Sequence, residues 1–171
     1  MIRFPNNAGV DVDLTPRRVL VDTGPLVAWL DPSGHHHDRA SEFFAGYRGN
    51  LLSCWPVLTE ACHLMPTHKV TGFLRWVAAG GLAIVEVPEK SLSDMADRMD
   101  KYLDLPMDMA DAALVWAAES QNVLDIATLD RRDFGIYRTT RGQALRNVLF
   151  DAAPAPAPVL KRTPARARRN G

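Results

Sequence analysis

The chain has 171 residues, 47% of them hydrophobic, and its 20 Lys and Arg balance its 20 Asp and Glu to a formal net charge of zero. This length suits one domain that buries a core without disulfides or a structural metal. The two cysteines, Cys54 and Cys62, suggest neither a disulfide framework nor a zinc knuckle, and we expect reduced thiols. The sequence has no signal-peptide core and no apolar run of about eighteen residues, so we expect a cytoplasmic protein with no membrane span.

The charge is distributed unevenly along the chain. Residues 1–150 carry fifteen Lys and Arg against nineteen Asp and Glu, whereas residues 151–171 carry five basic residues against Asp151. This last segment is rich in Pro and Ala, a composition that buries too little apolar surface to order itself. We therefore expect an N-terminal extension over 1–17, a folded domain over 18–150 and a disordered basic tail over 151–171. The tail either attracts RNA electrostatically or only solubilises the chain.

The expected strands and helices alternate through the folded domain. The apolar periodicity and the positions of Gly and Pro predict strands at 18–22, 51–55, 82–88, 123–130 and 147–150, and helices at 24–30, 38–48 with Asp38 as N-cap, 56–65, 71–81, 91–103 and 108–120. Strands separated by long helical segments are typical of parallel βαβ units. The sequence thus predicts an α/β fold, a three-layer α/β/α sandwich with a central, mostly parallel sheet.

Two of the expected strands end on a carboxylate. Asp22 closes the first strand, before Gly24-Pro25 begins a helix, and Asp130 closes the strand at 123–130. Ligands of parallel sheets bind beyond the carboxyl ends of the strands, so these residues predict an acidic site at one rim. Asp-Thr-Gly at 22–24 is also the signature of aspartic proteases. We reject that reading because the chain is rich in helical segments and has no second Asp-Thr-Gly.

Glu60 lies in an otherwise apolar expected helix. On a helical projection it falls at the edge of the apolar face, about 40° from Leu64. Its carboxylate therefore borders the core, and it is either a solvated flank residue or part of the acidic site.

Asp108 and Asp111 are three residues apart at the start of the helix expected at 108–120. Asp108 is placed to cap that helix and Asp111 to follow as its third residue, with both charges favoured by the helix dipole. Small and apolar residues follow Asp111, which indicates a closely packed first turn and a partly desolvated carboxylate. Asp133 is expected either in an ordinary polar turn or as a supporting partner of Asp130.

Convergence of Asp22, Glu60, Asp111 and Asp130 would require a counter-charge. Two carboxylates about 4 Å apart repel by roughly 4 kcal/mol at an effective dielectric near 20. A divalent cation held by oxygen ligands, Mg²⁺ or Mn²⁺, is the natural counter-charge, and such ions usually meet a phosphate substrate. The chemistry implied is phosphodiester hydrolysis, in which activated water attacks phosphorus in line.

Other residues with possible metal or binding roles have simpler explanations. Three successive histidines at 35–37 point in divergent directions and do not close a tetrahedral site, and His63 and His68 lack a partner at ligand spacing. Most of the large aromatic residues fall at apolar helical positions, where we expect them in the core: Trp29, Phe43, Phe44, Trp76 and Trp116.

Four segments, in this order and spacing, resemble the PIN-domain ribonucleases, specifically the VapC type of toxin in type II toxin–antitoxin pairs. They are VLVDTGPLVAWLD, WPVLTEACHLM, LPMDMADAALVWAAE and IATLDRRDFGIYR, and the resemblance extends over 18–150. It implies a metal-dependent endoribonuclease with an acidic quartet of Asp22, Glu60, Asp111 and Asp130.

The resemblance also implies a role for each residue. Asp22 and Asp111 would bind the metal directly, whereas Glu60 and Asp130 would hold or activate water. Thr23 and Thr128 would support these carboxylates by hydrogen bonds. The expected partners are an RNA substrate, a small antitoxin that covers the active site, and a second copy of the chain in a homodimer. The first seventeen residues and the tail lie outside the family pattern.

An alternative function is a PIN-like module that binds RNA or a partner without cutting it. The presence of all four acids favours an active enzyme. Cleavage of RNA with Mg²⁺ or Mn²⁺, and its loss with EDTA, separates these two hypotheses.

Overall fold

A five-stranded parallel sheet forms the centre of the molecule, in the order β3-β2-β1-β4-β5. The computed structural model describes residues 17–105 and 107–150, so the expected tail and all but the last residue of the expected N-terminal extension lie outside the described residues. The strands are β1 (Arg18–Val21), β2 (Asn50–Cys54), β3 (Ala83–Val85), β4 (Asp125–Ala127) and β5 (Arg146–Asn147). The chain runs outward from β1 to β3 and then crosses to β4, so the strand order reverses between β1 and β4.

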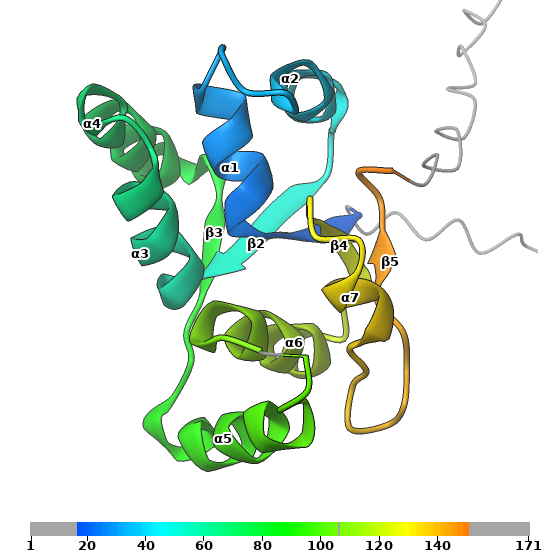
Figure 1. Cartoon of the computed structure of the whole chain (residues 1–171). Coiled ribbons are helices and arrows are strands. Elements are labelled where there is room, and N and C mark those ends of the chain that lie inside the picture. The colour runs from blue at the N-terminus through cyan, green and yellow to red at the C-terminus, as the bar shows by residue number, and fades with distance from the viewer. Residues whose placement is uncertain (1–16, 106, 151–171) are drawn as a thin grey trace, which may run out of the picture.

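Helices cover both faces of this sheet, and the predicted α/β/α architecture is confirmed. Figure 1 shows α1 to α4 on one side of the sheet and α5 and α6 on the other. The α-helices are α1 (Thr23–Leu30), α2 (His37–Gly46), α3 (Trp55–Leu64), α4 (Thr67–Trp76), α5 (Leu92–Lys101), α6 (Met109–Gln121) and α7 (Asp133–Ile136). A π-helical turn over Val77–Gly81 continues α4, and a 3₁₀ turn over Glu89–Ser91 precedes α5. No helix in the described ranges is both long and apolar enough to cross a membrane.

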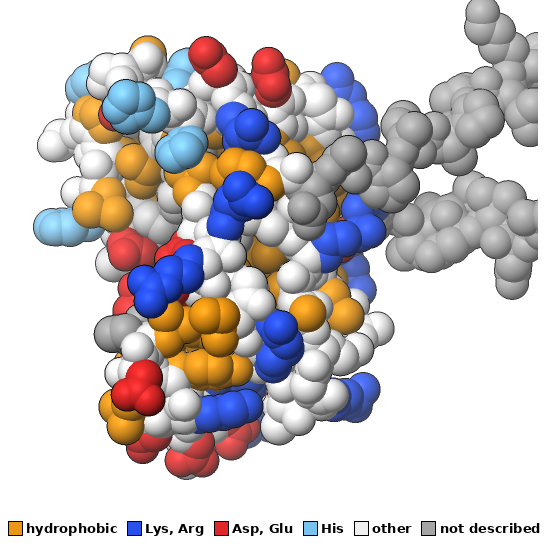
Figure 2. Space-filling model, turned by 45° about the vertical axis from the view of Figure 1, so that its right-hand side comes forward, with side chains coloured by type: hydrophobic (Ala, Val, Ile, Leu, Met, Phe, Trp, Pro, Cys, Tyr) orange, Lys and Arg blue, Asp and Glu red, His pale blue; other side chains and the backbone are white. Residues whose placement is uncertain are grey.

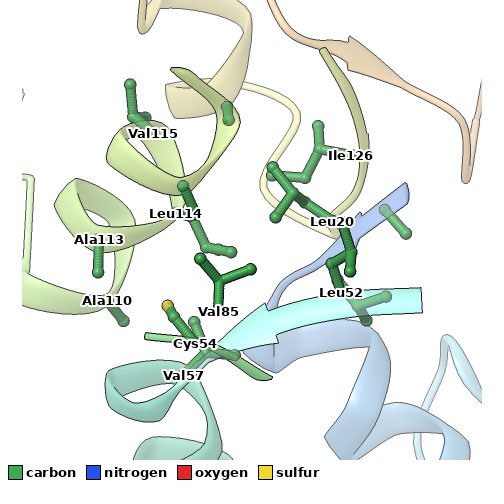
Figure 3. Close-up of a cluster of buried hydrophobic side chains, with 14 of the residues drawn as sticks. Leu20, Leu52, Cys54, Val57, Val85, Ala110, Ala113, Leu114, Val115 and Ile126 are labelled. Atoms are coloured by element: carbon green, nitrogen blue, oxygen red, sulfur yellow. The ribbon is translucent and has the colours of Figure 1, made fainter. Parts of the chain in front are cut away.

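The core fills both faces of the sheet, with α1, α3 and α4 on one side and α6 on the other. Val19, Leu20 and Val21 of β1 have no exposed surface, as expected for a central strand covered on both faces. Seven residues of α6 are buried and five of them are alanines, so the helix can approach the sheet closely. Leu114 of this helix lies near Val85 of β3 in Figure 3. Burying one such side chain contributes about 1.5–3 kcal/mol to stability.

Several predicted boundaries and caps are wrong in detail. Asp38 is not the N-cap of α2: the helix begins one residue earlier, and His36 occupies the cap position with no side-chain hydrogen bond. The reason is a turn closed by the His37 N–H, which donates to the Gly34 carbonyl and brings Asp38 into the first turn. β3 stops at Val85 instead of 88, and β4 stops at Ala127, three residues before Asp130.

The aromatic residues expected in the core are only half-buried. The rings of Trp29 and Phe44 are stacked with centroids 4.6 Å apart, and Trp29 meets Trp76 edge-on at 5.0 Å. They therefore form a cluster between α1, α2 and α4 at the edge of the core. Leu64, which the helical projection placed on the apolar face, is not buried either: 56% of its surface is exposed at the end of α3.

Candidate functional site

Asp22 lies at the carboxyl end of β1, where the strand order of the sheet reverses, and forms the N-cap of α1. Its Oδ1 accepts a hydrogen bond of 2.7 Å from the Thr23 N–H, and its Oδ2 accepts one of 2.7 Å from the Thr128 hydroxyl. The residue is only 8% exposed. A buried carboxylate is thus held in one orientation by hydrogen bonds to both of its oxygens.

Thr128 connects Asp22 with the loop that follows β4. Its hydroxyl donates to Asp22 and accepts a hydrogen bond of 2.9 Å from the Asp130 N–H. The Asp130 side chain is exposed, and its Oδ1 accepts from the Asp133 N–H at 2.8 Å, where α7 begins. Asp130 therefore lies beyond the strand in a turn that also positions α7.

Glu60 reaches the same rim from α3. Its Oε2 accepts a hydrogen bond of 2.6 Å from the Thr23 hydroxyl, and the residue is half-buried, as the helical projection predicted. Thr23 thus contacts Asp22 through its backbone and Glu60 through its side chain. The hydrogen bonds expected of Thr23 and Thr128 are present.

Asp111 approaches from the opposite face of the sheet, in the first turn of α6. Asp108 caps this helix as predicted, because its Oδ1 accepts from the Asp111 N–H at 2.9 Å. Asp111 Oδ2 accepts a hydrogen bond of 3.2 Å from the Tyr137 hydroxyl.

Sequence reasoning missed Tyr137, whose ring is completely buried beside the site. A buried tyrosine hydroxyl needs a hydrogen-bond partner, but nothing in the sequence identifies Asp111 as that partner. The only sequence signal is its place in the motif IATLDRRDFGIYR, shortly after Asp130 and Asp133.

Electrostatic coupling connects the acids of this rim. Burial raises the pKa of Asp22 from 3.8 to about 6 against the hydrogen bonds from Thr128 and Thr23, and the charges of Glu60 and Asp108 raise it further. The pKa of Asp111 is raised to about 7, first by burial and then by the charges of Asp108 and Asp22. Burial and the charge of Asp130 raise the pKa of Asp133. Asp22, Glu60, Asp108 and Asp111 thus act on one another as a single acidic cluster.

No Lys or Arg of the described residues forms an ion pair with Asp22, Glu60, Asp108 or Asp111. As the side chains of residues 17–105 and 107–150 are arranged, no three His, Cys, Asp or Glu residues lie close enough together to hold a metal ion. The donors of the cluster are all carboxylate oxygens, which suit Mg²⁺ and Mn²⁺. The residues present therefore fit such a cation by their chemistry, and its binding would require the side chains to turn toward one another.

A groove of about 700 Å³ lies between α3 and the start of α6 and reaches the acidic cluster. Glu60 and Asp108 line it together with Trp55 and Met109, which are 51% and 42% exposed. An extended chain could therefore approach the acids over an apolar surface.

Comparisons with known proteins give one related sequence and one related fold. No family model matches the chain. Ribonuclease VapC26 of Mycobacterium tuberculosis (strain ATCC 25618 / H37Rv) is 28% identical over 128 residues, which cover 72% of this chain and 95% of that protein. The crystal structure of Mycobacterium tuberculosis VapC20, described as a sarcin-ricin loop cleaving toxin, matches with a TM-score of 0.61 at 12% identity. The match covers 68% of this chain and 93% of the VapC20 chain. The resemblance to PIN-domain ribonucleases of the VapC type that the four motifs predict is thus confirmed, and the fold is theirs.

Proposed function

We propose that this protein is a Mg²⁺-dependent endoribonuclease that acts as the toxin of a toxin–antitoxin pair. The observation that carries the proposal is the acidic cluster at the point where the strand order reverses. Asp22, Glu60 and Asp111 come from three separate segments, interact electrostatically with one another or with Asp108, and have no basic partner among the described residues. The similarity to ribonuclease VapC26 supports RNA as the substrate.

In this proposal, Asp22 and Asp111 hold the cation. The hydrogen bonds from Thr23 and Thr128 fix Asp22, and the Tyr137 hydroxyl fixes one oxygen of Asp111. When bound, Mg²⁺ would offset negative charge on the phosphate and make water a stronger nucleophile.

Glu60 and Asp130 would hold the attacking water and accept its proton. The Thr23 hydroxyl orients Glu60, and the Asp133 N–H orients Asp130. Both carboxylates are more accessible than Asp22, which suits groups that exchange protons with water.

The same resemblance supports the proposed partners. We propose a small antitoxin that covers the acidic cluster, and a homodimer as the assembly of the toxin. The description of VapC20 as a toxin supports the first of these. Release of an antitoxin would then expose the site to RNA.

RNA cleavage by the purified protein tests the activity. We expect cleavage with Mg²⁺ or Mn²⁺, its loss with EDTA, and a loss of at least about 100-fold in Asp22→Asn and Asp111→Asn. Asp97→Asn is the matched control, because Asp97 is an exposed aspartate of α5 outside the cluster. Unchanged cleavage in both cluster variants, with the folds retained, would contradict the assignment. Binding of intact RNA without cleavage by the wild type would support the alternative of a non-cleaving module.

A further inference from the structure

Two arginines lie against the same aromatic ring near the acidic cluster. The guanidinium carbon of Arg39, on α2, is 4.7 Å from the centroid of the Phe150 ring, and that of Arg131 is 4.9 Å from it. Arg39 also donates a hydrogen bond of 3.2 Å to the Leu149 carbonyl. Residues distant in sequence thus form one small basic surface, which we call the arginine clamp and define as Arg39, Arg131 and Phe150.

The arginine clamp carries positive charge that no carboxylate of the described residues neutralises. Neither Arg39 nor Arg131 forms an ion pair within residues 17–105 and 107–150, and both side chains are exposed. Stacking on Phe150 restricts both guanidinium groups, and the N–H groups that Arg39 does not donate to Leu149 face no acceptor of the stacked ring and can bind an anion, as can those of Arg131. A polyanion that contacts both arginines would relieve the repulsion between these like charges.

The clamp also lies next to the acidic site along the chain. Arg131 directly follows Asp130, whose N–H is bonded to the hydroxyl that holds Asp22. Figure 1 shows α5 at the other end of the molecule from α2, and α5 carries the exposed residues Asp94, Asp97 and Asp100, whose charges disfavour an anion there. Figure 2 shows Lys and Arg side chains spread over the middle and lower parts of one face, with acidic side chains at its top, at its bottom and at its left edge.

The sequence beyond Phe150 extends the same charge. Residues 151–171 contain five basic residues and one acidic residue, and they follow directly after the last member of the clamp. We propose that the arginine clamp binds the phosphate backbone of single-stranded RNA beside the bond that is cut. The RNA would then run from the acidic cluster toward α2. This proposal rests on the proposed function for its substrate class, whereas its test measures binding alone. Basic surfaces that follow a single-stranded backbone bind with strong salt dependence.

Binding of a fluorescein-labelled, unstructured 20-nucleotide RNA to the full-length chain tests this proposal. The measurements use the Asp111→Asn background in EDTA, and a gel shows that the RNA stays intact. We expect the slope of log affinity against log salt to fall by about 0.7 for Arg39→Gln or Arg131→Gln, and by about 1.4 for the double variant. At 0.1 M salt the double variant would then bind about 25-fold more weakly.

Three further variants separate charge from structure. Arg75→Gln is the matched control, because Arg75 is an exposed arginine on α4 outside the clamp. It should change neither slope nor affinity, whereas Arg39→Lys and Arg131→Lys should keep most of the slope. Equal slopes in the double variant and the Arg75→Gln control would overturn the proposal, even if RNA is cleaved at the acidic cluster. Weakened binding of an acidic partner protein with unchanged RNA binding would also overturn it. Conversely, a protein that binds RNA through the clamp but never cleaves it would refute only the proposed function.

Discussion

Thr128 and Asp22 are joined by a buried hydrogen bond of 2.7 Å that connects the ends of the neighbouring strands β1 and β4. The Thr128 hydroxyl also accepts from the Asp130 N–H, so one side chain positions two acids of the site. This bond offsets part of the cost of burying the Asp22 charge. The hydrogen bonds of Thr128 therefore join the ends of the two strands and also lower the pKa of Asp22 in the acidic cluster.

Replacement of Thr128 should lower the stability of the fold and raise the pKa of Asp22. Thr128→Val keeps the volume of the side chain but leaves Asp22 Oδ2 without its donor, which should cost about 1–3 kcal/mol at pH 7.5. It should also raise the pKa of Asp22 further. Urea unfolding measures the first effect and NMR titration of the carboxyl group the second. Thr71→Val, at an exposed position of α4, is the control; an equal loss in both variants would contradict this role.

Stability without divalent cations should depend on pH with a definite sign. The folded chain raises the pKa of Asp22 to about 6 and that of Asp111 to about 7, whereas both groups titrate near 3.8 when unfolded. The folded state therefore binds more protons between these values, and the free energy of unfolding should fall as pH rises from about 4 to about 7. For Asp22 alone the loss is on the order of 3 kcal/mol.

Urea unfolding in EDTA across this pH range checks the prediction. Asp22→Asn and Asp111→Asn should each flatten the profile, because the amides do not ionise. A wild-type profile that falls no more steeply than the profiles of Asp22→Asn and Asp111→Asn would show that the two acids are not disfavoured in their charged forms.

Addition of Mg²⁺ should reverse part of this loss. A ligand that binds only the folded state at ten times its dissociation constant contributes about 1.4 kcal/mol. We expect the melting temperature to increase with Mg²⁺ at pH 7.5 in the wild type and in Asp97→Asn, but not in Asp111→Asn. Differential scanning calorimetry measures the shift, and an equal shift in all three proteins would place the binding elsewhere.

A close backbone approach at Gly49 makes a prediction independent of function. A Cβ atom there would overlap the Arg17 carbonyl oxygen and lie 2.6 Å from the Tyr47 hydroxyl. Arg17 O accepts hydrogen bonds from both the Tyr47 hydroxyl and the Asn50 N–H, so backbone would have to move at the start of β2. Gly49→Ala should therefore destabilise the fold by about 1–3 kcal/mol in thermal unfolding. A Cβ at Gly46 meets no atom within 4 Å, so Gly46→Ala should be neutral or stabilising.

The sequence was sufficient for those features that depend on local patterning. The apolar run at 19–21 predicted a buried strand, and the spacing of Asp108 and Asp111 predicted the cap of α6, because alternation, length and capping chemistry are properties of neighbouring residues. The cap of α2 was predicted wrongly, since the turn formed by Gly34 and His37 shifts that helix by one residue.

By itself, the sequence determined the parallel α/β class and the family resemblance, since both follow from the order of segments along the chain. Only the tertiary structure decided which atoms meet. It joined Tyr137 to Asp111 and Thr23 to Glu60, and it brought both Arg39 and Arg131 against the ring of Phe150. These contacts join residues 19 to 111 positions apart, and their energies depend on burial and distance, which local sequence patterns do not encode.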